Sequence, residues 1–133
     1  MKNMLNLMGR ILQATLFLPA GLAKLADFEG TVSYITSVGL PLPTIAAVAA
    51  LTLEILGSIA LIVGFQTRIV AGVLAGFTLV ASVFFHAFWA VAPEQAFVQQ
   101  LLFFKNLAVI GGLLVLVSTG AGTWSIDARK ESH

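Results

Sequence analysis

The chain has 133 residues, of which 59% are hydrophobic and only 10% are charged, and its formal net charge is +1. A soluble domain of this length could not bury so much apolar surface, so the composition indicates a membrane protein with several spans. The net charge by itself says nothing about nucleic acid, but the chain has no Lys/Arg run that could bind it, so we expect no nucleic-acid partner. The chain contains no cysteine, which excludes disulfides, iron–sulfur ligation and a thiol relay within it.

Four apolar stretches each have the length of a transmembrane helix. Between the first two, Asp27 can cap a short helix with one apolar face, which Gly39 and Pro41 would end. This helix is too short and mixed to cross a bilayer, so we expect it in the outer interface. The third stretch holds Gly72 and Gly76, a GxxxG pair that predicts close helix packing. We predict spans over residues 7–25, 43–64, 68–89 and 99–118, an interfacial helix over 28–38 and a polar tail over 119–133.

The basic residues predict the orientation of the chain in the membrane. Five of them lie at helix ends that a cytoplasmic N-terminus would place inside the cell, whereas Lys24 and Lys105 fall near outer helix ends. We therefore predict an all-α, integral membrane four-helix bundle with up-down-up-down topology and both termini cytoplasmic. It is expected to form a single multi-pass domain in the lipid bilayer of the bacterial inner membrane. The five inside residues are Lys2, Arg10, Arg68, Arg129 and Lys130.

A few polar residues interrupt the predicted spans, although burying charge at membrane depth is costly. Glu54 lies eleven residues into the second span, about 16 Å deep and so near the midplane. Lys105 and Asn106 interrupt the fourth span, while Lys24 and His86 lie near the outer ends of the first and third. Packing the four helices side by side would bring these groups together. We therefore predict a polar cavity, open toward the outer face, with these five residues as its binding site.

Each ionisable residue of this set also has a structural interpretation. Glu54 and Lys105 either belong to a site or form an ion pair that fixes helix register. Lys24, at a helix end, is expected to reach the membrane surface as an anchor. His86 is either an interfacial hydrogen-bonding residue or a proton carrier. The direction of the Lys105 side chain and the identity of its partner therefore decide much of the functional question.

The sequence offers few groups for metal binding or covalent catalysis. His86 is the only histidine before the C-terminal residue, and without cysteine a haem or copper centre lacks its usual ligands. No phosphate-binding loop or nucleophile motif is present. We therefore expect no metal site, and the sequence leaves open whether the protein is an enzyme.

Several short motifs follow one another in a set order over nearly the whole chain. They are Gly21-Leu22-Ala23-Lys24-Leu25, Asp27-Phe28, Gly39-Leu40-Pro41, Glu54, Gly64-Phe65-Gln66-Thr67-Arg68, His86, Phe104-Lys105-Asn106-Leu107-Ala108 and Ser125-Ile126-Asp127. This ordered set resembles the DoxX family of small bacterial and archaeal membrane proteins. The resemblance implies a four-helix membrane domain in which Lys24, Glu54, His86, Lys105 and Asn106 match polar positions of the family. It also implies redox association, because the family name derives from a subunit linked to quinol or thiosulfate:quinone oxidation.

The leading hypothesis is a quinone-handling or redox-associated membrane subunit. In it, Lys105 and His86 would hydrogen-bond the quinone oxygens, Glu54 would relay protons and Lys24 would lie at the cavity mouth. Quinone is the only cofactor expected, and electrons would come from a redox partner subunit because the chain holds no electron carrier. Two alternatives remain open. One is a transporter for a small solute or protons, which would depend on a homo-oligomer, and the other is a non-catalytic assembly or chaperone subunit.

Overall fold

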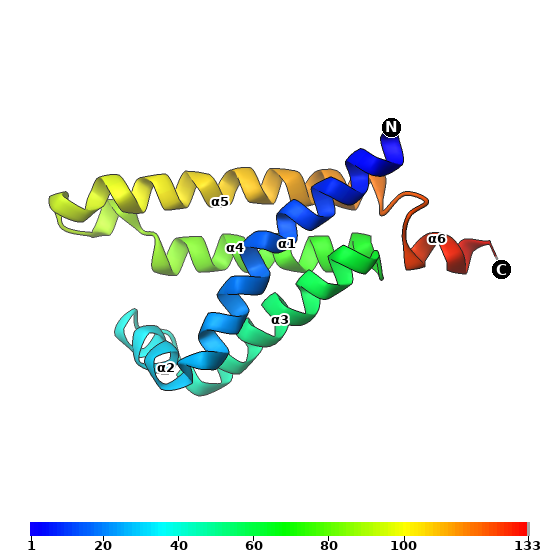
Figure 1. Ribbon diagram of the computed structural model, residues 1–133. Helices are drawn as coiled ribbons and strands as arrows, with labels where there is room; N and C mark the ends of the chain where they lie inside the picture. Colours follow the sequence, from blue (N-terminus) through cyan, green and yellow to red (C-terminus); the bar gives the residue numbers. More distant parts are fainter. Residues whose placement is uncertain (133) are drawn as a thin grey trace.

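The computed structural model describes residues 1–132, and all its regular secondary structure is helical. The long helices are α1, α3, α4 and α5; the short α2 lies between α1 and α3 in the chain, and the short α6 lies near the C-terminus (Figure 1). The predicted all-α class is therefore confirmed. The elements are α1 (Lys2–Ala26), α2 (Phe28–Ser37), α3 (Pro43–Val63), α4 (Thr67–Phe85), the 3-10 turn η1 (Phe88–Ala90), α5 (Pro93–Thr119) and α6 (Ile126–Glu131).

Three helical segments are long and apolar enough to cross a membrane: Pro43–Val63, Thr67–Ala90 and Pro93–Thr119. Helix α1 reaches that standard only together with α2, from which it is bent by 102°. Over the described residues, the structure therefore provides three candidate spans, or four if the bent pair counts as one. The predicted first span, residues 7–25, lies inside α1, but α1 does not qualify by itself.

Local sequence signals explain several helix ends. Pro43 and Pro93 occupy the first turns of α3 and α5, where the missing backbone N–H needs no helical partner. Asp27 ends α1 and caps α2, because its side chain accepts a hydrogen bond from the backbone N of Gly30 at 3.1 Å. Gly64 ends α3 with a φ of +72°, a left-handed conformation that glycine adopts without steric cost.

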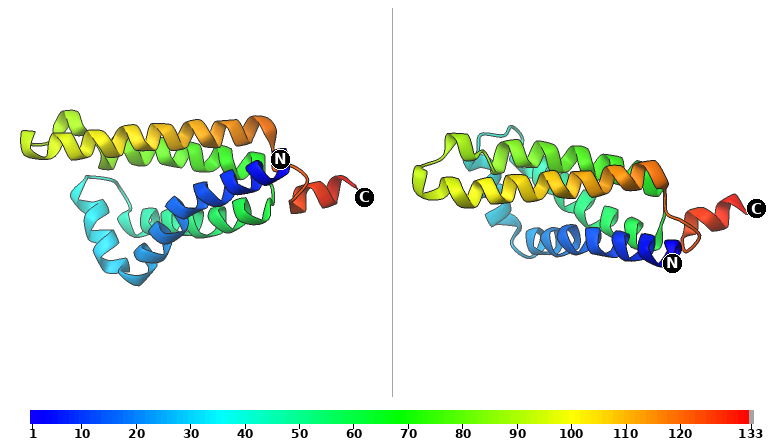
Figure 2. Two further views of the ribbon diagram at one scale, coloured as in Figure 1. Left: turned by 45° about the horizontal axis from the view of Figure 1, so that its top comes forward. Right: turned by 90° about the horizontal axis from the view of Figure 1, so that it is seen from above.

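The long helices pack as two pairs, α1 along α3 and α4 along α5. Figures 1 and 2 show that the pairs meet near the end that holds both chain termini. There, Leu61 of α3, Leu74 of α4 and Leu113 of α5 are fully buried in one apolar cluster. Toward α2 the two pairs diverge (Figure 1). The apolar core therefore closes the space between the pairs at one end and leaves room at the other.

Helices α1 and α3 approach each other closely at Gly21. A methyl group at this position would lie 2.7 Å from Ile55 Cγ1 and 3.0 Å from Glu54 Cβ. Contacts this short force the helices apart, so the crossing depends on the missing side chain. Because Lys24 lies one turn after Gly21, the same crossing brings its side chain toward α3.

The GxxxG pair of α4 does not pack in the way that we predicted. A methyl group at Gly76 would meet no atom within 4 Å, and one at Gly72 would meet only Val117 Cγ2, at 3.8 Å. Both glycines are exposed, because the buried face of α4 instead runs through residues such as Leu74 and Thr78. Within this chain, the prediction of close helix packing at the pair is wrong.

The predicted polar tail contains a helix that docks onto the turn between α3 and α4. The Asp127 carboxylate accepts hydrogen bonds from the backbone N atoms of Gln66 (2.7 Å) and Thr67 (2.9 Å), so it caps α4 from a distant part of the chain. Burial raises the pKa of the Asp127 carboxyl, but the hydrogen bonds from Thr67 and Gln66 and the charge of Lys130 outweigh it. The pKa therefore lies below its ordinary value.

Arg10 joins the same region from inside the protein. Its guanidinium is fully buried and donates hydrogen bonds to the carbonyl oxygens of Leu61, Ile62 and Trp124, at 2.9, 3.0 and 2.6 Å. The Nε atom donates to the Asn6 side chain at 2.9 Å. We expected Arg10 only as an orientation signal. The structure shows that it connects α1, the end of α3 and the C-terminal segment.

Candidate functional site

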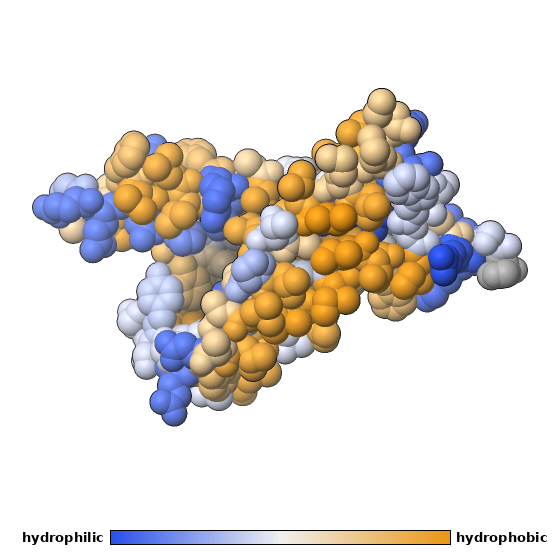
Figure 3. Space-filling view, viewed as in Figure 1, coloured by the Kyte–Doolittle hydropathy of each residue, from blue (hydrophilic) through white to orange (hydrophobic). Residues whose placement is uncertain are grey.

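A cavity of about 740 Å³ lies where the helix pairs diverge, and residues of all five helices from α1 to α5 line it. In Figure 3 the surface is hollowed between α2 and the N-terminal part of α5. Its lining is mostly aliphatic and aromatic, and its volume falls in the range of roughly 300–1,000 Å³ that is typical of small-molecule pockets. The five predicted site residues all line this one cavity: Lys24, Glu54, His86, Lys105 and Asn106.

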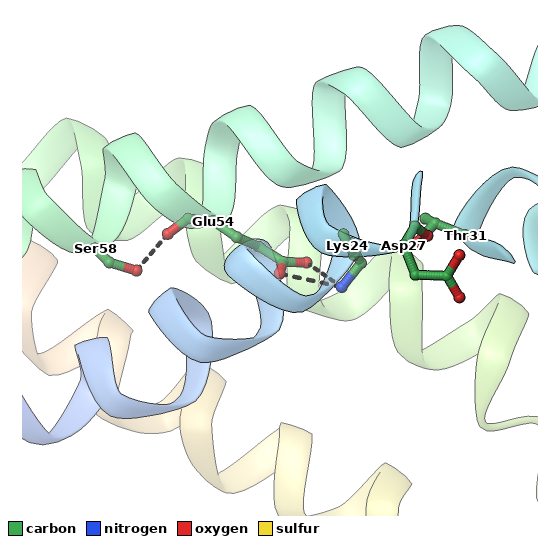
Figure 4. A network of polar contacts seen from close by, with 5 residues as sticks. All are labelled: Lys24, Asp27, Thr31, Glu54 and Ser58. Carbon is green, nitrogen blue, oxygen red and sulfur yellow. Dashed lines mark hydrogen bonds and ion pairs between the residues drawn. The ribbon is translucent and has the colours of Figure 1, made fainter. Parts of the chain in front are cut away.

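Lys24 and Glu54 form an ion pair across the contact of α1 with α3. The Lys24 Nζ atom lies 2.9 Å from Glu54 Oε1 and 3.1 Å from Oε2 (Figure 4). Glu54 is only 3% exposed, whereas the Lys24 side chain is 30% exposed. This pair corrects two expectations. Lys24 points at Glu54 rather than serving as a surface anchor, and the partner of Glu54 is Lys24, not Lys105.

Three further polar residues near this pair were not predicted as site residues. Asp27 and Thr31 line the cavity beyond Lys24, and the Thr31 hydroxyl donates to the Asp27 carbonyl oxygen at 3.0 Å (Figure 4). On the other side of the pair, the Ser58 hydroxyl donates to the backbone carbonyl of Glu54. The spacing of three residues between Lys24 and Asp27, which puts both on one helix face, was the signal that could have identified Asp27.

Asn106 and His86 hold the opposite wall together. The buried Asn106 side chain donates to the Ser82 hydroxyl at 2.9 Å, and Ser82 in turn donates to the Thr78 carbonyl oxygen at 2.7 Å. His86 Nδ1 lies 2.9 Å from Gln99 Oε1. Both contacts join α4, or its C-terminal end, to α5, so they stabilise the wall and also present polar groups to the cavity.

Lys105 lines the cavity with an exposed side chain and has no hydrogen bond or ion pair within residues 1–132. The Glu54 carboxylate is bound to Lys24, and the Asp27 carboxylate accepts the Gly30 N–H. Lys105 is thus the cavity cation without an acidic partner in the described part of the chain. Its ammonium donors are available to a ligand.

The arrangement suits a ligand that is mostly apolar and carries polar oxygen atoms. Lys105 offers donors on one wall, and Lys24 with Glu54 offers a charged pair on the other. His86 Nδ1 donates to Gln99 Oε1, which leaves Nε2 of the neutral ring as an acceptor. Beyond Glu54, toward the chain termini, Phe17 packs with the apolar core cluster. The polar groups therefore gather in the open half of the molecule, with an apolar layer behind them.

Together, the helices and their apolar composition define a multi-pass integral membrane protein, and it contains a cavity with several polar residues in its lining. The chain belongs to the DoxX family, whose family model matches residues 5–87, and it is an inner-membrane protein. This confirms the family resemblance and the predicted location.

Three relatives illustrate the range of the similarity. The chain is 34% identical to "Inner membrane protein YphA" of Escherichia coli (strain K12), over 96% of this chain and 91% of that protein. It is 40% identical to "Inner membrane protein YqjF" of the same organism, over 91% and 88%. It is also 30% identical to "Surfeit locus protein 4 homolog" of Drosophila melanogaster, over 98% of this chain but 42% of that protein. No solved structure matches the chain.

Proposed function

We propose that the cavity binds a membrane-dissolved molecule with an oxygen-bearing head, and that this ligand is a quinone. The observation that carries the proposal is the convergence of five polar side chains, contributed by α1, α3, α5 and the end of α4, on one mostly apolar cavity. Intramembrane ionisable residues are costly and commonly mark ligand or proton pathways. A pocket with apolar walls and a few polar groups is also the usual form of a small-molecule site.

In this proposal, Lys105 donates a hydrogen bond to a quinone oxygen. His86 Nδ1 already donates to Gln99 Oε1, so His86 Nε2 accepts a hydrogen bond from the hydroxyl of the reduced quinol. Lys105 has no competing partner among the described residues, and its position opposite the ion pair leaves it free to meet the ligand. Lys24 fixes the Glu54 carboxylate in the cavity, and Glu54 exchanges protons with the ligand. Because the chain has no cysteine to ligate an iron–sulfur cluster, we place electron exchange with a separate redox partner.

We further propose that α1, α3, α4 and α5 cross the membrane in alternating directions, with both termini in the cytoplasm. Both termini lie at the same end of the molecule, as alternating crossings require (Figures 1 and 2). The C-terminal segment with Arg129 and Lys130 lies at that end, in keeping with the excess of basic residues on the cytoplasmic side of membrane proteins. The cavity then opens in the outer half of the bilayer.

The proposal is tested by extracting lipids from the protein purified in mild detergent and quantifying quinone by mass spectrometry. The wild type is compared with Lys105→Met, which removes the unpartnered cation, and with Lys2→Met, a matched change at the exposed N-terminus. We expect near-stoichiometric quinone with the wild type and Lys2→Met, and loss of quinone from a folded Lys105→Met.

Absence of quinone from the wild type would contradict the quinone assignment. Another lipid-phase molecule that co-purifies and is lost in Lys105→Met would replace quinone as the ligand and keep the cavity as the site. Equal quinone in all three proteins would remove Lys105 from the site. Solute flux through liposomes without any bound ligand would favour transport instead.

A further inference from the structure

Helix α2 forms the cavity wall beside the opening but is only lightly attached to the rest of the protein. Gly30, Thr31, Tyr34 and Ile35 of α2 all line the cavity. Ile35 is the single buried residue of this ten-residue helix. Segments with few buried apolar contacts open at a lower free energy than the core does.

Both connections of α2 have the form of a hinge. On one side, Asp27 alone separates α2 from α1, and the two helices meet at 102°. On the other side, Gly39 and Leu42 both adopt positive φ values, +83° and +50°. A positive φ is uncommon for leucine, so this connection holds strained backbone. Hinges commonly consist of a few such residues at the ends of an element.

One aromatic contact connects α2 to the opposite helix pair. The rings of Tyr34 on α2 and Phe85 at the end of α4 lie 5.1 Å apart between centroids, tilted by 37°. Both residues line the cavity, so their contact extends across the space between the pairs. The main packing of α2 is against α3, which belongs to its own side.

We propose that α2 is a lid over the α4 side of the cavity, apart from the opening toward α5, and that the Tyr34–Phe85 contact is its closing contact. Breaking this contact lets α2 move about Asp27 and the Gly39–Leu42 connection, and opens a passage between α2 and α4. A lipid-phase ligand reaches Glu54 by this passage. The purpose of the lid rests on the proposed function, whereas its existence is tested without any quinone.

The test uses the fact that the natural chain has no cysteine. Tyr34→Cys and Phe85→Cys are combined and joined by a short bifunctional methanethiosulfonate reagent, which reductant removes. Access to the cavity is measured as the rate at which dicyclohexylcarbodiimide, an apolar carboxyl reagent, modifies Glu54 in liposomes, quantified by peptide mass spectrometry. Tyr34→Cys alone, treated with the same reagent, is the matched control.

We expect crosslinking to slow Glu54 modification about tenfold or more, since it removes the minor open state. Reductant should restore the rate, the control should show no such loss, and Tyr34→Ala should react faster than the wild type. An unchanged rate in the crosslinked protein would overturn the lid. So would failure of the two thiols to crosslink in the folded protein. Neither result bears on whether the cavity binds quinone, which is measured separately.

Discussion

The two partners of the Lys24–Glu54 ion pair are not equivalent, so replacing one should destabilise the protein more than replacing the other. Replacing Lys24 with Met leaves a carboxylate that is 3% exposed without its partner. Breaking a buried pair in this way typically costs about 3–5 kcal/mol. Replacing Glu54 with Gln leaves only a lysine whose side chain is 30% exposed and can still reach water. Lys24→Met should therefore destabilise the protein clearly more than Glu54→Gln does.

The cost of Lys24→Met has an upper bound that depends on pH, because the stranded carboxyl can take up a proton. For a glutamate with the reference pKa of about 4.3, protonation costs ~3.7 kcal/mol at pH 7 and about 1 kcal/mol at pH 5. We therefore expect Lys24→Met to lower the free energy of unfolding by roughly 3 kcal/mol at pH 7 and by about 1 kcal/mol at pH 5. The value at pH 7 lies below the bound because Lys24 is partly exposed in the wild type. The double variant Lys24→Met/Glu54→Gln should recover most of the loss, since neither charge remains.

The assay is unfolding by sodium dodecyl sulfate titration in mixed micelles, followed by tryptophan fluorescence at pH 7 and pH 5. Glu54→Gln serves as the matched single change on the other partner. A loss of stability in Lys24→Met that is the same at both pH values would show that no buried carboxylate is left unpaired, because such a group must respond to protons. Equal losses for the two single variants would do the same.

The remaining predictions concern the helix contacts. Gly21→Ala should lower the free energy of unfolding by about 1–3 kcal/mol in the same assay, because its methyl group would force α1 away from α3. Gly76→Ala, with open space around it, should change this free energy by no more than about 0.5 kcal/mol. A larger loss in Gly76→Ala than in Gly21→Ala would contradict the close approach of α1 and α3 at Gly21. Arg10→Met should cost about 3 kcal/mol or more, because it strands several carbonyl groups, and unchanged trypsin cleavage of the C-terminal segment would contradict its connecting role. Asp127→Ala should cost about 1–2 kcal/mol through loss of the α4 cap. Folding lowers the pKa of Asp127, so its contribution to the free energy of unfolding is complete above about pH 3.9 and is lost as the pH falls through the lower pKa of the folded state. Hydrogen-exchange protection of α6 that stays constant down to pH 2 would contradict this.

Hydrophobic periodicity located the long helices well because apolar length and helix-ending residues act locally. The sequence predicted a helix from residue 43 to 64, and α3 spans Pro43–Val63. It also predicted the short helix after Asp27, whose cap is visible in the residue type. The helix in the C-terminal tail was missed, because its main fixed point is the docking of Asp127 on Gln66 and Thr67, about 60 positions earlier in the chain.

The residues that line the cavity were predictable in part, but the ion-pair partner of Glu54 was not. Predicting that Lys24, Glu54 and Lys105 line one cavity required only the depth of each residue along its helix. Choosing between Lys24 and Lys105 as the partner of Glu54 required knowing that α1 packs on α3 and that Gly21 lets them meet. The packing prediction for Gly72 and Gly76 failed for the same reason, because it also depended on which helices meet. A glycine pattern shows where another helix can approach, not whether one does.

Quinone binding in the cavity is tested most directly by photolabelling the protein in liposomes with an azidoquinone and mapping the adducts on its peptides. A quinone bound in the cavity should give adducts on lining residues such as Phe77, Phe84 and Tyr34, and excess unlabelled quinone should remove them. Adducts spread over the lipid-facing surface, for example around Leu12 or Val115, with no competition by unlabelled quinone, would contradict the claim that this cavity is a quinone site.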